Sequence, residues 1–295
     1  MGLGVSGHWI TALDPGHLHR RRAQLRYVAS ETRSPGRARA LWRTVAIPSE
    51  HGGWGLTLEP VLLGVLLTWS WWGLAIGLAA FLAFLVRTPL KLALVDRRRH
   101  RSLPRTRLAT RIAVVELVLI VALGATALAG AGAAWLIPVA AALPLVVIEL
   151  WFDVRSRSRR LVPELCGAIG IAAVAAAIVI AGAGAASLAI AAWMILGARA
   201  LASIPYVREQ IARSRHGDVP RTMADAFSAA AIVVAVIAAF VSPDVVLGTI
   251  AVAVLVVAQS IAIRRAHIAP VKVIGLRQMA GGLLVVAATA LGAAL

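Results

Sequence analysis

Long apolar stretches recur along this chain and constrain its fold more than any other feature. They cover residues 53–70, 73–95, 107–129, 132–152, 162–183, 185–206, 223–242, 244–263 and 272–293. A helix of about 20 apolar residues is long enough to span the hydrocarbon core of a bilayer. The composition agrees, because 60% of the residues are hydrophobic and only 15% are charged. The sequence therefore predicts an all-α polytopic membrane protein with nine transmembrane helices.

Segments rich in basic residues alternate with connections that lack Lys and Arg, and this alternation predicts the topology. The connections 69–72, 129–132, 183–186 and 242–244 contain no Lys or Arg. All 30 basic residues lie before residue 53 or in the segments 87–111, 155–160, 199–221 and 264–277. The positive-inside rule assigns these segments to the cytoplasm, so we expect a cytoplasmic amino terminus and Leu295 outside. Topology and contact with anionic lipid heads explain most of the net charge of +17. We expect no nucleic-acid partner, because no recognition module is present.

The first 47 residues differ from the rest of the chain. They are basic and have no sustained apolar period, which predicts a disordered cytoplasmic tail, with a start codon placed too early as the alternative. Residues 48–295 then form the nine-helix transmembrane domain. The single cysteine, Cys166, excludes an internal disulfide bond and a cysteine-rich metal site.

Ionisable residues inside the predicted spans are candidates for a binding site. Burying them in hydrocarbon is costly unless each one faces a cavity or a partner. They lie in or beside the predicted cytoplasmic halves of the helices, so we expect a pocket that opens to the cytoplasm. Helical spacing places several of them on shared faces. The candidate ligand-binding residues are His51, Glu59, Arg87, Lys91, Arg199, Tyr206, Arg208 and Glu209.

Glu59 is the most unusual of these residues, because it enters the membrane beside Pro60 in the stretch PSEHGGWGLTLEP. We expect it to pair with Arg87 or Lys91. That pair either orients the cation towards an anionic ligand head or only holds two helices together. Arg97, Arg98 and Arg99 are interpreted as a solvated run of charge.

The stretch IPSEHGGWGLTLEPVLLGVLL resembles the opening of the YwiC-like family of uncharacterised bacterial membrane proteins. The matching residues are Pro48, His51, Gly52, Trp54 and Pro60. The resemblance continues more weakly through residues 47–295, including RTPLKLAL and SIPYVREQIARSR. It implies an integral protein of the bacterial cytoplasmic (inner) membrane.

The layout is also similar to that of the UbiA-type intramembrane prenyltransferases. That likeness implies a UbiA-like bundle of nine helices with chemistry in the cytoplasmic loops after the second and sixth helices. FDVRSRSRRLVPELCGAIGIA looks like the connection from the fourth helix to the fifth in that family. The family holds an isoprenyl diphosphate through Mg²⁺ with paired aspartates in both loops, because carboxylate oxygens hold Mg²⁺ and the metal neutralises the diphosphate.

This chain departs from that pattern. The loop after the second span offers Asp96 alone, and the loop after the sixth offers Glu209 and the distant Asp218. Asp96 and Asp218 are thus the candidate metal ligands, no cofactor is assigned, and Mg²⁺ and enzymatic activity both stay open. A basic pocket can instead bind phosphate or carboxylate directly. We expect the cytoplasm-facing pocket to bind a membrane lipid or an isoprenoid with an anionic head, such as an isoprenoid phosphate. The resemblance implies a divergent prenyltransferase-like protein. The alternatives are a non-catalytic membrane subunit and a transporter.

Overall fold

The part of the chain that the structure describes is helical. The computed structural model describes residues 42, 44–46, 51–100, 103–155, 160–217, 222–264 and 270–295. The helices are α3 (His51–Leu67), α4 (Trp71–Arg98), α5 (Pro104–Ala131), α6 (Leu136–Val154), α7 (Leu161–Ala181), α8 (Ala186–His216), α9 (Thr222–Val241), the short η1 (Pro243–Val245), α10 (Val246–Arg264) and α11 (Val271–Ala294). Each predicted apolar stretch therefore corresponds to one α-helix.

Eight of these helices are long and apolar enough to cross a membrane. The expectation of a multi-pass membrane protein is thereby confirmed. The remaining helix, α3, has 17 residues. At about 1.5 Å per residue it is shorter than the hydrocarbon core, which is about 30 Å thick. The ninth crossing stays a prediction.

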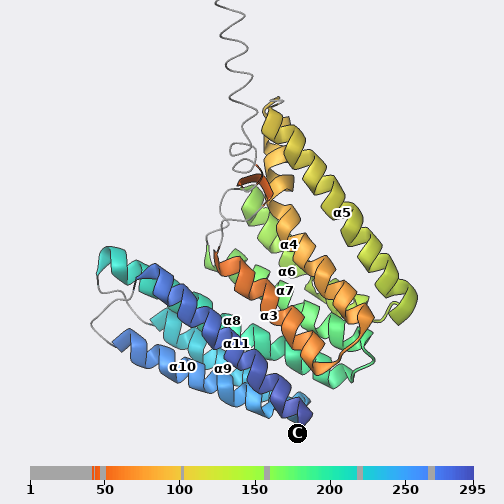
Figure 1. The fold of residues 1–295 in the computed structure, drawn as a ribbon. Coiled ribbons are helices and arrows are strands. Elements are labelled where there is room, and N and C mark those ends of the chain that lie inside the picture. The colour runs from red at the N-terminus through yellow and green to blue at the C-terminus, as the bar shows by residue number, and fades with distance from the viewer. Residues whose placement is uncertain are drawn as a thin grey trace, which may run out of the picture.

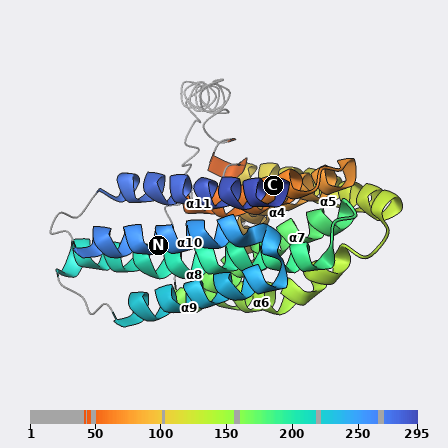
Figure 2. The ribbon, with the colours of Figure 1, turned by 90° about the horizontal axis from the view of Figure 1, so that it is seen from below.

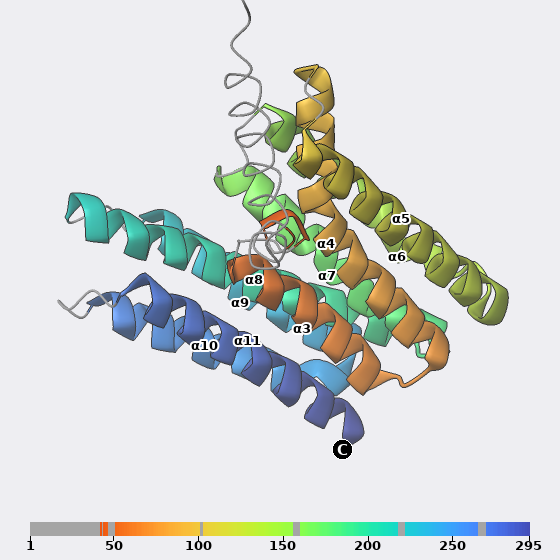
Figure 3. The ribbon, with the colours of Figure 1, turned by 45° about the horizontal axis from the view of Figure 1, so that its top comes forward.

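The helices spread apart from one end of the molecule to the other. Figure 1 shows the turns from α3 to α4, α5 to α6, α7 to α8 and α9 to α10 gathered at one end, together with the carboxy terminus. The ends that carry the basic segments spread apart, with α4 and α5 pointing away from α8 to α11 (Figure 3). The last four α-helices run side by side (Figure 2). The connections that lack Lys and Arg therefore lie together, as the alternation of basic segments requires.

Helices α7 and α8 form the centre of the bundle and are the most buried of the long helices. Alanines fill their packed faces, among them Ala175, Ala177, Ala191 and Ala198, each essentially inaccessible to solvent. Small residues let helix backbones approach closely, which is the main source of packing between helices in lipid. Helix α3 packs against α7, α11, α4 and α8, so it contacts both α4 and the set of helices from α8 to α11.

Local sequence signals set several helix ends. The Ser70 hydroxyl accepts a hydrogen bond of 2.9 Å from the Gly73 backbone N–H and caps the start of α4. Pro104 occupies the first turn of α5, where a missing N–H costs nothing. Gly217 follows α8 with a φ of 78°, a left-handed value that favours glycine after a helix.

Most of the predicted tail, and Asp218, lie outside the described residues. Within 42–46, Val45 is buried and packs with Ala93 of α4 and Ala109 of α5.

Candidate functional site

Glu59 of α3 and Arg199 of α8 form a buried ion pair. Arg199 Nη2 lies 2.8 Å from Glu59 Oε1. Their exposed fractions are only 2% and 5%. The same Nη2 donates a hydrogen bond of 3.0 Å to the backbone carbonyl of Gln278 in α11. One guanidinium group thus connects three helices.

The expectation that Glu59 pairs with Arg87 or Lys91 is wrong. Helix α3 also packs against α8 and α11, and the Glu59 carboxylate is directed towards them. Gly282 of α11 provides the space, because a Cβ atom at that position would overlap the Glu59 carboxylate. The partner was missed because helical spacing identifies residues on one helix face but does not show which neighbouring helix that face meets.

Two amides and a hydroxyl extend this pair. The Gln259 side-chain amide of α10 donates to Ser203 Oγ and to Gln278 Oε1, both at 3.4 Å. Gln259 and Ser203 are buried, with exposed fractions of 4% and 3%. The polar cluster of Glu59, Arg199, Ser203, Gln259 and Gln278 therefore joins α3, α8, α10 and α11. The two glutamines are not ionisable and so are not among the predicted site residues, although an amide inside an apolar span is a signal that indicates such a cluster.

Arg87 and Lys91 of α4 instead face two carboxylates of α6. Arg87 lies 2.6 Å from Glu149 and 3.6 Å from Asp153. Lys91 Nζ lies 2.8 Å from Asp153 Oδ1. Gly167 of α7 makes room for this cluster, since a Cβ atom there would lie 2.7 Å from the Glu149 carboxyl carbon. These two cations are therefore already neutralised by carboxylates of the chain.

The other candidates at the end of α8 have separate surroundings. Arg208 Nη1 lies 2.9 Å from Glu164 Oε2 of α7. Tyr206 is buried and packs with Ile263 of α10 and Ile274 of α11. Glu209 is also buried, with an exposed fraction of 8%. His51 is the first residue of α3. The structure thus divides the candidate residues among several contacts, and it brings Glu59 and Arg199 together.

The Asp96 carboxylate is already hydrogen-bonded to side chains of α5. It accepts hydrogen bonds from Arg105, at 3.2 and 3.3 Å, and from the Thr106 hydroxyl at 2.6 Å. The described residues contain no group of three or more His, Cys, Asp or Glu side chains that could hold a metal ion. They therefore do not fit a Mg²⁺-diphosphate centre of the prenyltransferase kind.

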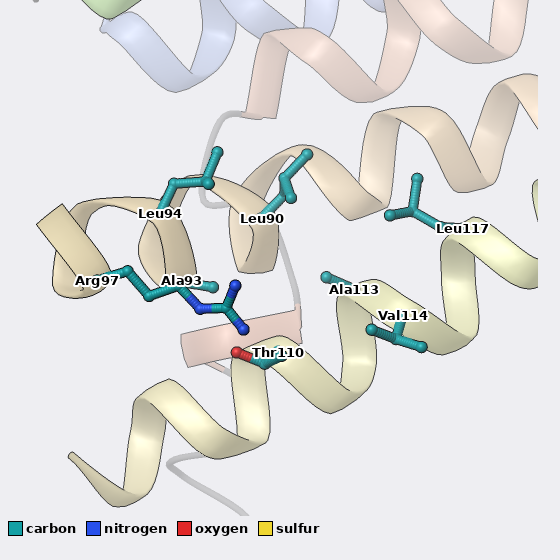
Figure 4. A pocket seen from close by; sticks show the side chains of 8 residues that line it. All are labelled: Leu90, Ala93, Leu94, Arg97, Thr110, Ala113, Val114 and Leu117. Carbon is teal, nitrogen blue, oxygen red and sulfur yellow. The ribbon is translucent and has the colours of Figure 1, made fainter. Parts of the chain in front are cut away.

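A groove of about 130 Å³ lies between α4 and α5. Its lining residues are Leu90, Ala93, Leu94, Arg97, Thr110, Ala113, Val114 and Leu117. Figure 4 shows the Arg97 guanidinium between the two helices, next to Thr110, while the rest of the lining is aliphatic. Arg97 makes no ion pair with any other residue that the structure describes. Arg97 is exposed, which agrees with its interpretation as part of a solvated run, and it also lines this groove, whose second wall comes from α5.

A model of a known protein family matches the first half of the helical region. Residues 47–180 match the family model of YwiC-like protein. This match and the apolar helices indicate an integral membrane protein. No curated protein and no solved structure matches the chain, so the UbiA-like bundle stays a prediction. The matched region includes Glu59 and the groove but ends before α8, so the buried ion pair connects it to the remainder of the chain.

Proposed function

We propose that this protein binds a membrane lipid with an anionic head in the groove between α4 and α5. The observation that carries the proposal is the groove itself, which has aliphatic walls and one guanidinium group. Leu94, Val114 and Leu117 are exposed on it and present an apolar surface to lipid chains. From Leu90 to Arg97 the groove runs along about 10 Å of α4, at about 1.5 Å per residue.

Charge complementarity defines the head group. Arg97 lies in the last turn of α4 with Arg98, and Arg99 follows the helix. Arg107 and Arg111 are exposed on α5. A guanidinium group donates several hydrogen bonds to a phosphate, and the pair is charge-assisted. A phosphate head at Arg97 with its chain along the aliphatic wall satisfies both ends of the groove. A phospholipid and an isoprenoid phosphate share this chemistry.

The proposal includes no catalytic step. Asp96 is held by Arg105 and Thr106, and the described residues supply no carboxylate cluster for a metal-bound diphosphate. Arg87 and Lys91 are paired with Glu149 and Asp153. A lipid-binding membrane protein is therefore better supported than a prenyltransferase. The remaining alternative is a membrane subunit that binds no lipid, and the next experiment distinguishes the two.

The lipid proposal is tested by Arg97→Gln with Arg98→Gln as the matched control, because Arg98 does not line the groove. Native mass spectrometry would measure binding of dioleoyl phosphatidic acid, a long-chain polyprenyl phosphate and dioleoyl phosphatidylcholine. Loss of one charged hydrogen-bonding group weakens binding by about tenfold or more. We expect that loss for Arg97→Gln with the preferred anionic lipid, and little change for Arg98→Gln.

A second variant, Ala113→Leu, fills the groove without removing charge and should also weaken binding. The preference between phosphatidic acid and the polyprenyl phosphate identifies the source of the phosphate. Equal binding of the neutral and anionic lipids, or equal affinities for the two arginine variants, would contradict the proposal.

We further propose that α3 provides a ninth crossing, which places the amino terminus in the cytoplasm and Leu295 outside. The absence of Lys and Arg from these four connections and their common position in Figure 1 support this topology. Alkaline phosphatase, which is active only outside the cytoplasm, should be active when fused after Leu295. It should be inactive when fused between Arg99 and Pro104. Activity of the fusion between Arg99 and Pro104, or inactivity of the fusion after Leu295, would contradict the proposed topology.

A further inference from the structure

One face of α8 changes from apolar to polar at Arg199. Leu188, Ala192 and Ile195 occupy this face in the first half of α8, and Ala192 and Ile195 are fully buried. The same face continues with Arg199, Ser203, Tyr206, Gln210 and Arg213, spaced alternately four and three residues apart, as one stripe of a helix requires. This second set is called the α8 polar stripe below.

Four residues of the α8 polar stripe contact α10 or α11. Arg199 donates to the Gln278 carbonyl, and Ser203 accepts from Gln259. Tyr206 packs between Ile263 and Ile274. Arg213 donates to the backbone carbonyl of Ile263, near the end of α10. Polar groups thus follow the interface of the three helices from the Glu59–Arg199 pair to the basic end of the bundle.

Three buried polar atoms of the polar cluster lack hydrogen-bond partners within the described part of the chain. They are Arg199 Nε, a donor, and two acceptors, Gln259 Oε1 and the Glu59 Oε1 that forms the ion pair with Arg199. All three side chains are at least nine-tenths buried. Buried polar groups are nearly always hydrogen-bonded, and groups without a protein partner are commonly satisfied by water. A donor and an acceptor in the same cluster match the two capacities of a water molecule.

We propose that the α8 polar stripe lines a water-filled path that begins at the basic end and stops at the Glu59–Arg199 pair. Gln278 lies about 10 Å from the start of α11, at about 1.5 Å per residue, so the path is short. Beyond Arg199 the interface closes, because Ile195, Val252 and Val285 are buried in one aliphatic cluster. Water therefore reaches the buried pair from one side of the membrane only.

Cysteine accessibility tests this path, because the thiolate is the reactive form and a thiol ionises far more readily in water than in an apolar core. The background is Cys166→Ala, and iodoacetamide is the probe. The test positions are Ser203→Cys, which changes little in size, and Gln210→Cys. Ala202→Cys is the matched control at the same depth on another face, since Ala202 and Ser203 have exposed fractions of 1% and 3%. Ala192→Cys is the control on the same face beyond the pair.

We expect alkylation at positions 203 and 210 to be at least about tenfold faster than at 202 and 192, with 210 faster than 203. Variants are compared only where gel filtration in detergent gives the elution of the unmodified protein. If Ser203→Cys and Gln210→Cys react no faster than Ala202→Cys, the stripe is dry and the proposal is wrong. Fast reaction at Ala192→Cys would show a path through the whole membrane and would also overturn it.

Discussion

Replacing Glu59 by Gln is expected to lower the free energy of unfolding by about 3–5 kcal/mol, the cost of breaking a buried ion pair by removing one partner. The substitution keeps the shape of the side chain, but it leaves the Arg199 charge buried without its carboxylate. The Gln278 carbonyl continues to accept a hydrogen bond from Arg199 and cannot neutralise the charge. Thermal and denaturant unfolding of the purified protein in detergent would measure the loss.

Glu164→Gln provides the matched control for this prediction. Glu164 also pairs with an arginine of α8, Arg208, but the two side chains are 35% and 40% exposed. Exposed ion pairs contribute about 0–1 kcal/mol, so this variant should unfold almost as the original does. A double variant, Glu59→Gln with Arg199→Gln, should recover part of the loss, because no unpaired charge remains buried. If Glu59→Gln and Glu164→Gln lowered the free energy of unfolding equally, the Glu59–Arg199 pair would not be buried.

The Glu59→Gln variant also separates an effect on stability from an effect on lipid binding. The Glu59→Gln substitution leaves the groove between α4 and α5 unchanged, because Glu59 does not line it. The folded fraction should therefore bind anionic lipid as before. The earlier idea, in which Glu59 orients Arg87 or Lys91 towards a ligand head, is not supported by the contacts, since both cations pair with α6.

The positions of the helices could be predicted from the sequence because each depends on a local property. A run of about 20 apolar residues has few stable alternatives to a spanning helix, since lipid offers no partners for free backbone groups. The predicted stretch 162–183 and the observed α7, Leu161–Ala181, differ by only a residue or two at each end. The predicted first stretch, 53–70, extends past the observed end of α3 at Leu67, because Ser70 already caps the start of α4.

The contacts between helices could not be predicted in the same way, because they depend on how each helix is rotated. Helical spacing correctly places Arg87 and Lys91 on one face of α4, and both reach Asp153. It gives no information on whether Glu59 of α3 faces α4 or α8. The deciding residue is Gly282, more than 200 positions along the chain, whose missing side chain admits the carboxylate.

Glycines also determine how closely α3 and α4 approach α7, and the second large effect is expected there. The side chain of Ile178 is fully buried in α7. It sits against Gly64 of α3 and against Gly73 and Gly77 of α4, where added Cβ atoms would lie 2.7, 2.8 and 3.6 Å from it. Gly64 is the tightest of the three, because its Cβ would also lie 3.1 Å from the Ala175 backbone carbonyl. Backbone atoms cannot rotate away as a side chain can.

Gly64→Leu should therefore force α3 away from α7 and lower the free energy of unfolding by about 3 kcal/mol, the upper end of typical overpacking costs. Gly64→Ala should cost about 1 kcal/mol, because one methyl group needs a smaller shift. Gly124→Leu in α5 is the matched control, since no atom lies within 4 Å of a Cβ at that position. It should leave stability unchanged or raise it by about 0.5–1 kcal/mol, because glycine disfavours helix. Thermal unfolding of the three variants would measure these changes. Similar stabilities of Gly64→Leu and Gly124→Leu would mean that α3 is not held against α7 by this contact.

Because α3 also carries Glu59, displacement of α3 should disturb the Arg199 pair as well. Gly64→Leu combined with Glu59→Gln should therefore lower the free energy of unfolding by less than the sum of the two single variants.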